Sequence, residues 1–105
     1  MSERVKKYLS VLKRIRRLGD RAKREYVRTK QFVECVSECA KNVIKGNVPL
    51  TSRQMKNLRH KRHDLRALSK RKTSLQAKRK ILQKGGFLTA LLPVLSVLGS
   101  VLLQN

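Results

Sequence analysis

The sequence predicts an all-α protein, and three observations lead to that fold class. Between Glu3 and Lys45 the chain holds no proline and a single glycine. Across the same stretch, apolar residues recur at the spacing of one face of a helix. Further along, leucines again recur at helical intervals, until a Gly-Gly pair separates them from an uncharged end. We therefore expect helices joined by short loops.

The first predicted element is a long amphipathic helix over residues 3–45, ending at Lys45-Gly46-Asn47. Ser2 followed by Glu3 offers its start. Gly19-Asp20 is its weak point, because glycine inside a helix costs about 1 kcal/mol relative to alanine, and the element is open to division there. Its apolar seam follows a heptad pattern. The a positions are Val5, Leu12, Gly19, Tyr26, Val33 and Ala40, and the d positions are Tyr8, Ile15, Ala22, Thr29, Val36 and Val43.

A loop at residues 46–50 is predicted to precede a basic second helix over residues 51–84. Thr51 at the N-cap and Gln54 at N3 form a capping box. Ser74 can cap a new segment after an interruption at Thr73-Ser74. The apolar stripe of this second part is Leu58, Leu65, Leu68, Leu75 and Leu82. We expect a helical hairpin with cationic faces outward, and a core slim enough that stability depends on self-association or a partner.

The third segment is the apolar tail, residues 85–105, which follows the Gly85-Gly86 hinge. From Phe87 to Leu103 it holds 17 uncharged residues. As a helix these span about 26 Å, slightly less than the roughly 30 Å hydrocarbon slab. Pro93 is expected to kink or divide this helix. A short membrane span, an interfacial helix and a helix buried in a protein assembly all fit. The chain thus has three segments, 1–46, 51–84 and 85–105.

Charge is the strongest indication of function. The formal net charge is +21, from 27 Lys and Arg against 6 Asp and Glu, and residues 51–105 hold 13 bases and one acid. A solvated face normally mixes both signs, so this surplus predicts a polyanionic partner, and phosphate is its natural counter-charge. The candidate nucleic-acid-binding residues are Arg53, Lys56, Arg59, Lys61, Arg62, Arg66, Lys70, Arg71, Lys72, Lys78, Arg79, Lys80 and Lys84.

The sequence argues against an enzyme and against a metal or cofactor site. Asp64 is the lone carboxylate of the basic half, so no acid–base pair is available there. Gly85-Gly86 lacks the strand before it and the Lys-Ser/Thr after it that a phosphate loop needs. Cys35 and Cys39 do not combine with His60 and His63 in a zinc-finger spacing. We expect the two cysteines to be apolar packing residues in a reducing compartment.

Recognition of a specific base sequence is also not indicated. The four aromatic residues are not spaced as a base-stacking platform. No helix-turn-helix or finger spacing appears. The composition therefore favours non-specific binding of double-stranded DNA by charge neutralisation.

Residues 58–95 read LRHKRHDLRALSKRKTSLQAKRKILQKGGFLTALLPVL, a dense basic run joined to GGFL and LLP. This run resembles small basic proteins of Polinton/Maverick elements and adintoviruses, and the carboxyl end of the adenovirus core protein X (mu) precursor. Residues 1–48 have no counterpart in that comparison. The resemblance implies a virion core protein that condenses double-stranded DNA, located in the virion core or the host nucleus.

The resemblance also implies processing by an adenovirus-like cysteine protease. Such sites have an aliphatic residue, any residue and Gly-Gly; here Gln83 stands in the aliphatic position. The cut would fall between Gly86 and Phe87, with Gly85 before it. Two glycines between helical segments independently favour an accessible backbone, and a helix cap and hinge is the other interpretation of the pair.

Two other classes of protein remain open. A membrane-active or tail-anchored protein would use residues 87–103, beside bases worth roughly 1 kcal/mol each near an anionic lipid surface. A partner-binding adaptor would use residues 5–44 to dock a second copy or a capsid protein, with the basic half as a nuclear-entry signal. The first residues, MSERVKKYLS, show no secretory pattern, so a nuclear or cytoplasmic address is expected.

Overall fold

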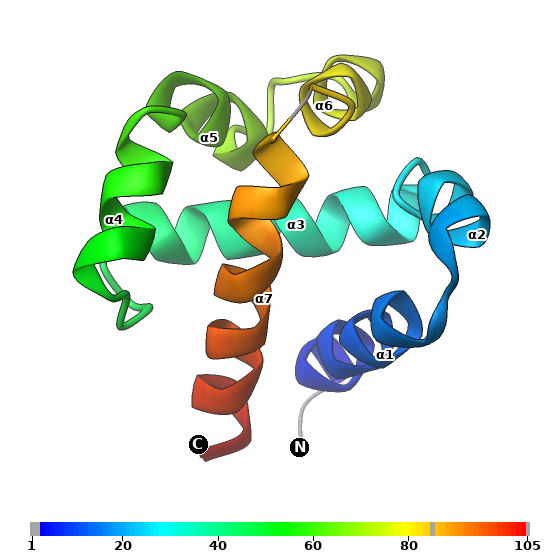
Figure 1. Ribbon diagram of the computed structural model, residues 1–105, viewed down its shortest axis with the longest axis horizontal. Coiled ribbons are helices and arrows are strands. Elements are labelled where there is room, and N and C mark those ends of the chain that lie inside the picture. Colours follow the sequence, from blue (N-terminus) through cyan, green and yellow to red (C-terminus); the bar gives the residue numbers. More distant parts are fainter. Residues whose placement is uncertain (1–2, 85, 105) are drawn as a thin grey trace.

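A computed structural model describes residues 3–84 and 86–104, and over these residues the chain is all-helical, as predicted (Figure 1). Ser2 and Gly85, assigned above to a helix start and to the hinge, lie outside the described residues, as does the side chain of Val5. The helices are α1 (Glu3–Arg17), α2 (Asp20–Tyr26), α3 (Lys30–Ile44), α4 (Ser52–Arg59), α5 (Arg62–Ser69), α6 (Leu75–Leu82) and α7 (Phe87–Gln104).

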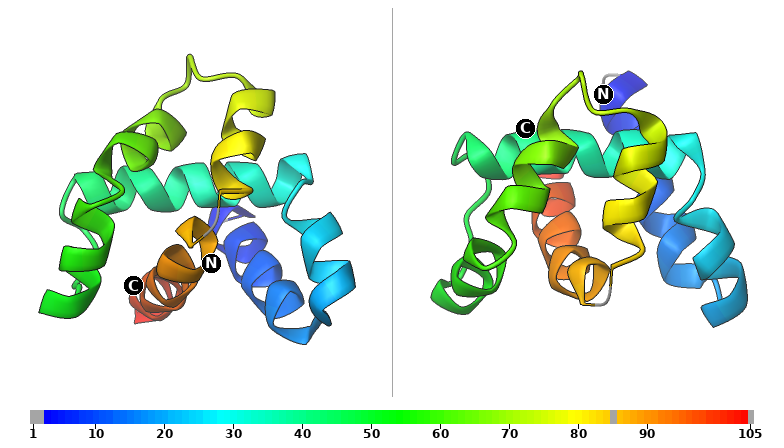
Figure 2. Two further views of the ribbon diagram at one scale, coloured as in Figure 1. Left: turned by 45° about the horizontal axis from the view of Figure 1, so that its top comes forward. Right: turned by 90° about the horizontal axis from the view of Figure 1, so that it is seen from above.

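Helix α3 is the centre of the molecule. Helices α5 and α6 pack on one side of it, and α1 and α7 pack on the other side (Figure 2). The α3 side chains that meet these neighbours are almost completely buried, with Phe32 and Val36 at 0% exposure. The Cα radius of gyration is 12.9 Å, equal to the about 13 Å expected of a compact domain of this length.

The first predicted element is three helices, not one. Gly19 divides it where the sequence indicated, with an extended backbone at the N-cap of α2 (φ −71°, ψ 171°). A second division at residues 27–29 was not predicted. There Thr29 Oγ1 donates to the Tyr26 carbonyl oxygen (2.7 Å) and accepts from the Phe32 N–H (3.3 Å), so one side chain ends α2 and begins α3. At each division the chain changes direction, so the apolar residues of α1, α2 and α3 pack into one core.

The loop and caps of the middle of the chain follow the prediction. Helix α3 ends at Ile44, and Gly46 adopts φ +77° just beyond it. The Gly46 and Asn47 N–H groups bond back to Val43 and Asn42, the pairing of a Schellman motif. Both bonds of the Thr51–Gln54 capping box are present at 3.1 Å. Ser74 accepts from the Ala77 N–H at 3.1 Å and starts α6.

The basic second element is also more divided than predicted. The interruption before Ser74 is present, but a further break at His60-Lys61 separates α4 from α5. Helix α5 then packs along α3 through Leu65 and Leu68, which are 5% and 0% exposed. The expected packing of the basic half on the first half is therefore observed for α5 and α6, whereas α4 packs on α7 and α5. The basic half forms three short helices instead of one hairpin arm.

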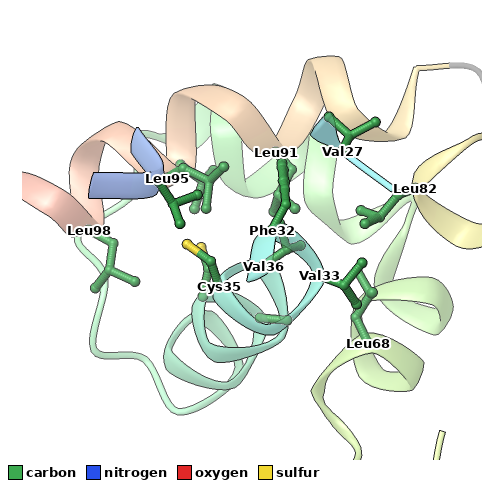
Figure 3. Packing of buried hydrophobic residues seen from close by; sticks show 14 of the residues in the cluster. Val27, Phe32, Val33, Cys35, Val36, Leu68, Leu82, Leu91, Leu95 and Leu98 are labelled. Carbon is green, nitrogen blue, oxygen red and sulfur yellow. The ribbon is translucent and has the colours of Figure 1, made fainter. Parts of the chain in front are cut away.

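The apolar tail forms a helix that belongs to the core. On α7 the side chains of Leu91 and Leu95 point toward Phe32 and Cys35 of α3 (Figure 3). Pro93 lies on the exposed side, and α7 continues through it, so the predicted division of this helix is not observed. The completely or almost completely buried residues of α7 are Phe87, Leu91, Val94, Leu95 and Leu98. The slim two-part core expected from the sequence is thus completed by a third component.

Within the described residues, no single helix is long and apolar enough to cross a membrane. Helix α6 and residues 87–101 of α7 satisfy the length and hydropathy criteria only as a pair, and they are bent by 101° at the break between them.

Candidate nucleic-acid interface

Helices α4, α5 and α6 expose most of the bases that the sequence singled out. On α5, Leu65 and Leu68 face α3, and the bases Arg62 and Arg66 are therefore directed to solvent. We call the basic side formed by α5, α6 and the loop between them the upper surface (Figure 2). Its exposed members, on α5, on α6 and in the segments next to them, are Arg62, Arg66, Lys70, Arg71, Lys72, Lys80 and Lys84. Arg53, Lys56 and Arg59 are also exposed, on α4, which packs on α7 and α5 and is not counted in this surface.

The loop between α5 and α6 projects from this side of the molecule (Figure 2). Lys70, Arg71 and Lys72 are consecutive and exposed there. A turn closes the loop, in which the Thr73 N–H donates to the Lys70 carbonyl oxygen at 3.2 Å. Three cations are therefore held together on a short, projecting segment.

Three predicted residues are half-buried: Lys61, Lys78 and Arg79. Lys78 Nζ donates to Ser37 Oγ at 3.1 Å, and desolvation followed by repulsion from Lys41 lowers the pKa of Lys78. The Arg79 side chain donates through Nε to the Arg28 carbonyl oxygen at 2.6 Å. Lys78 and Arg79 therefore fasten α6 to the rest of the fold, so their nitrogens are less available to phosphate than those of the exposed bases.

Lys84 is exposed but already paired. Its Nζ lies 3.0 Å from Asp64 Oδ1, and this ion pair joins the end of α6 to α5. Among the thirteen predicted residues, Lys84 is the one with a carboxylate partner in the part of the chain that the structure describes. The other exposed bases of the upper surface require counter-charge from outside the chain.

A second basic surface, on α1 and α2, was not assigned to nucleic acid by the sequence analysis. We call it the lower surface, because α1 and α2 lie across α3 from the α5–α6 loop (Figure 2, left). Arg14 stacks over the Tyr26 ring at 5.2 Å, and Arg16 Nη2 donates to Ser96 Oγ at 2.9 Å. Its other exposed bases include Lys13, Arg17, Arg21 and Arg24. The available signal was the 14 bases of residues 1–50, but acids in the same stretch made it look like a mixed-charge seam.

The predicted cleavage position lies at the start of a core helix. Gly86 is exposed with φ +82°, and its carbonyl oxygen accepts from the Ala90 N–H at 3.1 Å. Phe87 is only 1% exposed. A protease needs an extended, accessible backbone, so cleavage after Gly86 would require the first turn of α7 to unwind. The geometry is that of a cap and hinge, and cleavage stays a prediction.

The two cysteines are free thiols inside the fold. Burial raises the pKa of Cys35 and of Cys39 to about 12, so both stay protonated near neutral pH. His60, in the break between α4 and α5, and His63, on α5, are both exposed. Within residues 3–84 and 86–104, no group of three or more His, Cys, Asp or Glu side chains is placed to hold a metal ion.

No family model matches this chain, and no match is found among curated proteins or solved structures. The resemblance described above therefore depends on the motif in residues 58–95 alone.

Proposed function

We propose that this chain is a virion-core-like structural protein that binds and condenses double-stranded DNA without sequence preference. The observation that carries the proposal is the exposure of the Lys and Arg side chains between residues 51 and 84, and how few of them have a carboxylate partner among residues 3–84 and 86–104. Most of them lie exposed on a folded helical scaffold, and nearly all of those have no carboxylate neighbour in the described residues. Such a surface is stabilised by a polyphosphate, because each neutralised phosphate releases condensed counterions.

Condensation requires more than binding, because one molecule must touch two duplex segments. The upper surface and the lower surface lie on opposite sides of α3. A rigid body with cations on both sides can neutralise two neighbouring duplexes at once. The proposed action is therefore bridging by a folded particle, which differs from coating by an unfolded basic tail.

The resemblance to Polinton/Maverick and adenovirus core-type proteins supports the same class, and with it a location in the virion core or host nucleus. An adenovirus-like protease and a capsid protein remain proposed partners. The apolar side of residues 5–44 is covered by other parts of the same chain, notably Leu91 and Leu95 of α7, so folding does not need a partner on that side. Likewise, α7 turns its apolar side inward and exposes Thr89, Pro93 and Ser100, which favours a role in the core over one in a membrane.

The test is binding of a random-sequence duplex measured by fluorescence anisotropy at increasing salt concentration. The logarithm of affinity should fall linearly with the logarithm of salt, with a slope of about −0.9 per phosphate contact. Replacing Arg62, Arg66 and Arg71 together by Gln should make the slope less steep by about 2–3 units, whereas the matched replacement by Lys should leave it nearly unchanged. Binding that ignores salt, or no binding near physiological salt, would refute the proposal.

A further inference from the structure

We propose that Ser74 is a phosphorylation site for a serine/threonine protein kinase that selects basic substrates. Ser74 closes the α5–α6 loop and directly follows Lys70-Arg71-Lys72-Thr73. The modification goes beyond DNA binding and does not depend on it. Its effect on DNA affinity, described below, does rest on the proposed function.

The hydroxyl of Ser74 is accessible for reaction. Its side chain is exposed, its oxygen accepts from the Ala77 N–H, and no described atom accepts its hydrogen. Several other hydroxyls already donate to a carbonyl oxygen. These are Thr29 to Tyr26, Ser37 to Val33, Ser69 to Arg66 and Ser100 to Ser96, at 2.7, 2.9, 2.7 and 3.2 Å. The Ser74 hydroxyl can therefore react without breaking a bond that it donates.

The backbone before Ser74 is an exposed non-helical loop, closed by the single turn bond from the Thr73 N–H to the Lys70 carbonyl oxygen. A cleft accepts an exposed, non-helical segment more readily than one inside an element. Residues 70–74 are outside the helices, and both Lys70 (φ −83°, ψ 130°) and Ser74 (φ −64°, ψ 156°) are extended. Ser10 also follows two lysines, but it lies in the middle of α1, where its neighbours turn to other sides of the helix. Ser10 therefore serves as the internal comparison.

The charges before Ser74 suit an acidic recognition cleft. Bases stand four, three and two positions before the hydroxyl, with the guanidinium of Arg71 at the third, and all three are exposed. Kinases discriminate substrates largely by such charge patterns, since complementary charges attract the right segment and repel the wrong one. Ser52, another exposed hydroxyl, follows Val48-Pro49-Leu50-Thr51 and has no base in those positions.

In the reaction, Ser74 Oγ attacks the γ-phosphorus of ATP. The new Oγ–P bond forms as the bond from that phosphorus to the ADP oxygen breaks, and the hydroxyl proton passes to a base of the kinase. The product adds a charge of about −1.5 to −2 at neutral pH. It lies at the N-terminus of α6, where unpaired N–H groups and the helix dipole favour an anion, and beside Arg71 and Lys72. Against the three bases of the loop, the modification thus cancels about half to two-thirds of the positive charge.

The experiment treats the full-length protein with a basophilic serine/threonine kinase and Mg-ATP and locates phosphate by tandem mass spectrometry. We expect one dominant phosphate, at Ser74. Ser74→Asn keeps a good N-cap but offers no hydroxyl, so it should lower incorporation at least tenfold while leaving the circular dichroism melt unchanged. Ser10→Ala should leave incorporation as in the parent, and Arg71→Ala should lower kcat/KM about tenfold.

Equal incorporation into the parent and Ser74→Asn would overturn the inference, as would no incorporation under conditions that fully modify a basic reference peptide. The regulatory consequence has its own readout. Phosphorylated protein should dissociate from random duplex DNA at lower salt, with a salt slope about 1–2 units less steep. Stoichiometric Ser74 phosphate on a protein that never binds DNA would refute the proposed function and leave the modification site standing.

Discussion

At the scale of single residues, Gly99 lets α7 pack tightly against Leu12 of α1. A Cβ built on Gly99 would lie 2.5 Å from Leu12 Cδ1, and both residues are buried. Gly99→Ala should therefore lower the free energy of unfolding by about 1–2 kcal/mol, because overpacking outweighs the helix propensity gained by removing glycine. Urea unfolding followed by circular dichroism measures the difference.

The matched control for this change is Ser100→Ala, at the next position of α7, where the side chain is exposed. It should alter stability by less than about 0.5 kcal/mol. Adding Leu12→Ala to Gly99→Ala should show a favourable coupling in a double-mutant cycle, since the shortened side chain makes room for the new methyl group. Additive effects would show that the two helices do not meet at this point.

The buried thiols should make the folded protein less stable at alkaline pH. Burial raises the pKa of Cys35 and Cys39 from 9.0 to about 12, while in the unfolded chain both should ionise near pH 9. Between pH 9 and pH 12 the folded state binds more thiol protons than the unfolded state does. The contribution of the two thiols to stability is therefore fully present below pH 9 and is lost as the pH rises toward 12. The free energy of unfolding should fall by about 2–3 kcal/mol from pH 8 to pH 10.

Urea titrations of the parent and of a Cys35→Ala/Cys39→Ala variant at pH 8, 9 and 10 test this statement. The variant should be less stable at pH 8 but should lose less stability on going to pH 10. Tyr8 packs against the same thiols, and burial raises its pKa as well, so a residual decline in the variant is expected. Parallel declines in the two proteins would contradict the assignment to the thiols.

At the scale of elements, local signals predicted local structure well. The caps at Thr51 and Ser74 and the stop at Gly46 each depend on bonds between residues three to five positions apart, so a short window of sequence contains them. The break at Thr29 was hidden because a threonine at a d position reads as a tolerable seam residue. It forms because Thr29 satisfies the ends of two helices at once.

The lack of charge in α7 could not predict whether this helix packs in the protein core or in a membrane. A membrane and a protein core accept the same apolar composition, and the choice depends on residues far away in the sequence. One usable signal was present: Thr89, Pro93, Ser96 and Ser100 recur at intervals of four, three and four. They form a stripe of small or polar residues, and three of them are exposed in the fold. Uncharged helices therefore need a search for weakly polar stripes before they are assigned to membranes.

If α7 is part of the core, the chain without it should not fold. A protein ending at Gly86 loses Phe87, Leu91 and Leu95, each at most 1% exposed, together with the rest of that helix. Burying one such side chain contributes about 1.5–3 kcal/mol, so the loss exceeds the whole stability of a typical small domain. In the absence of DNA, residues 1–86 should show no cooperative thermal unfolding by circular dichroism.

Two point variants separate loss of the core from loss of length. Leu91→Asp places a charge at a fully buried position and should abolish the cooperative transition. Thr89→Asp places the same charge on the exposed side of the first turn of α7, where the helix dipole favours it, and should be neutral or slightly stabilising. A truncated chain that unfolds cooperatively at the parent temperature would show that α7 is a dispensable tail.

At the scale of the whole molecule, composition predicted the kind of partner but not its arrangement around the protein. Thirteen bases in one segment suggested a single cationic helix. The fold instead distributes bases over two sides of α3 and withdraws Lys78 and Arg79 into internal contacts. Counting charges along the chain cannot separate these cases, because sidedness arises only when distant segments such as α1 and α5 pack on a common helix.

The two-sided arrangement makes binding and condensation separable. Replacing Lys13, Arg17 and Arg21 of the lower surface by Gln leaves the upper surface intact, so the variant should still bind a short duplex, with a salt slope reduced by no more than about 3 units. It should need several times more protein than the parent to condense long DNA, measured by light scattering at equal salt.

The matched variant loses Arg62, Arg66 and Lys70 from the upper surface. It should show the same impairment of condensation, because bridging requires both surfaces. A third variant of the same net charge, with its replacements divided between the two surfaces, would condense DNA equally poorly if only total charge mattered. That result would mean that the protein acts as a diffuse polycation, without a bridging geometry.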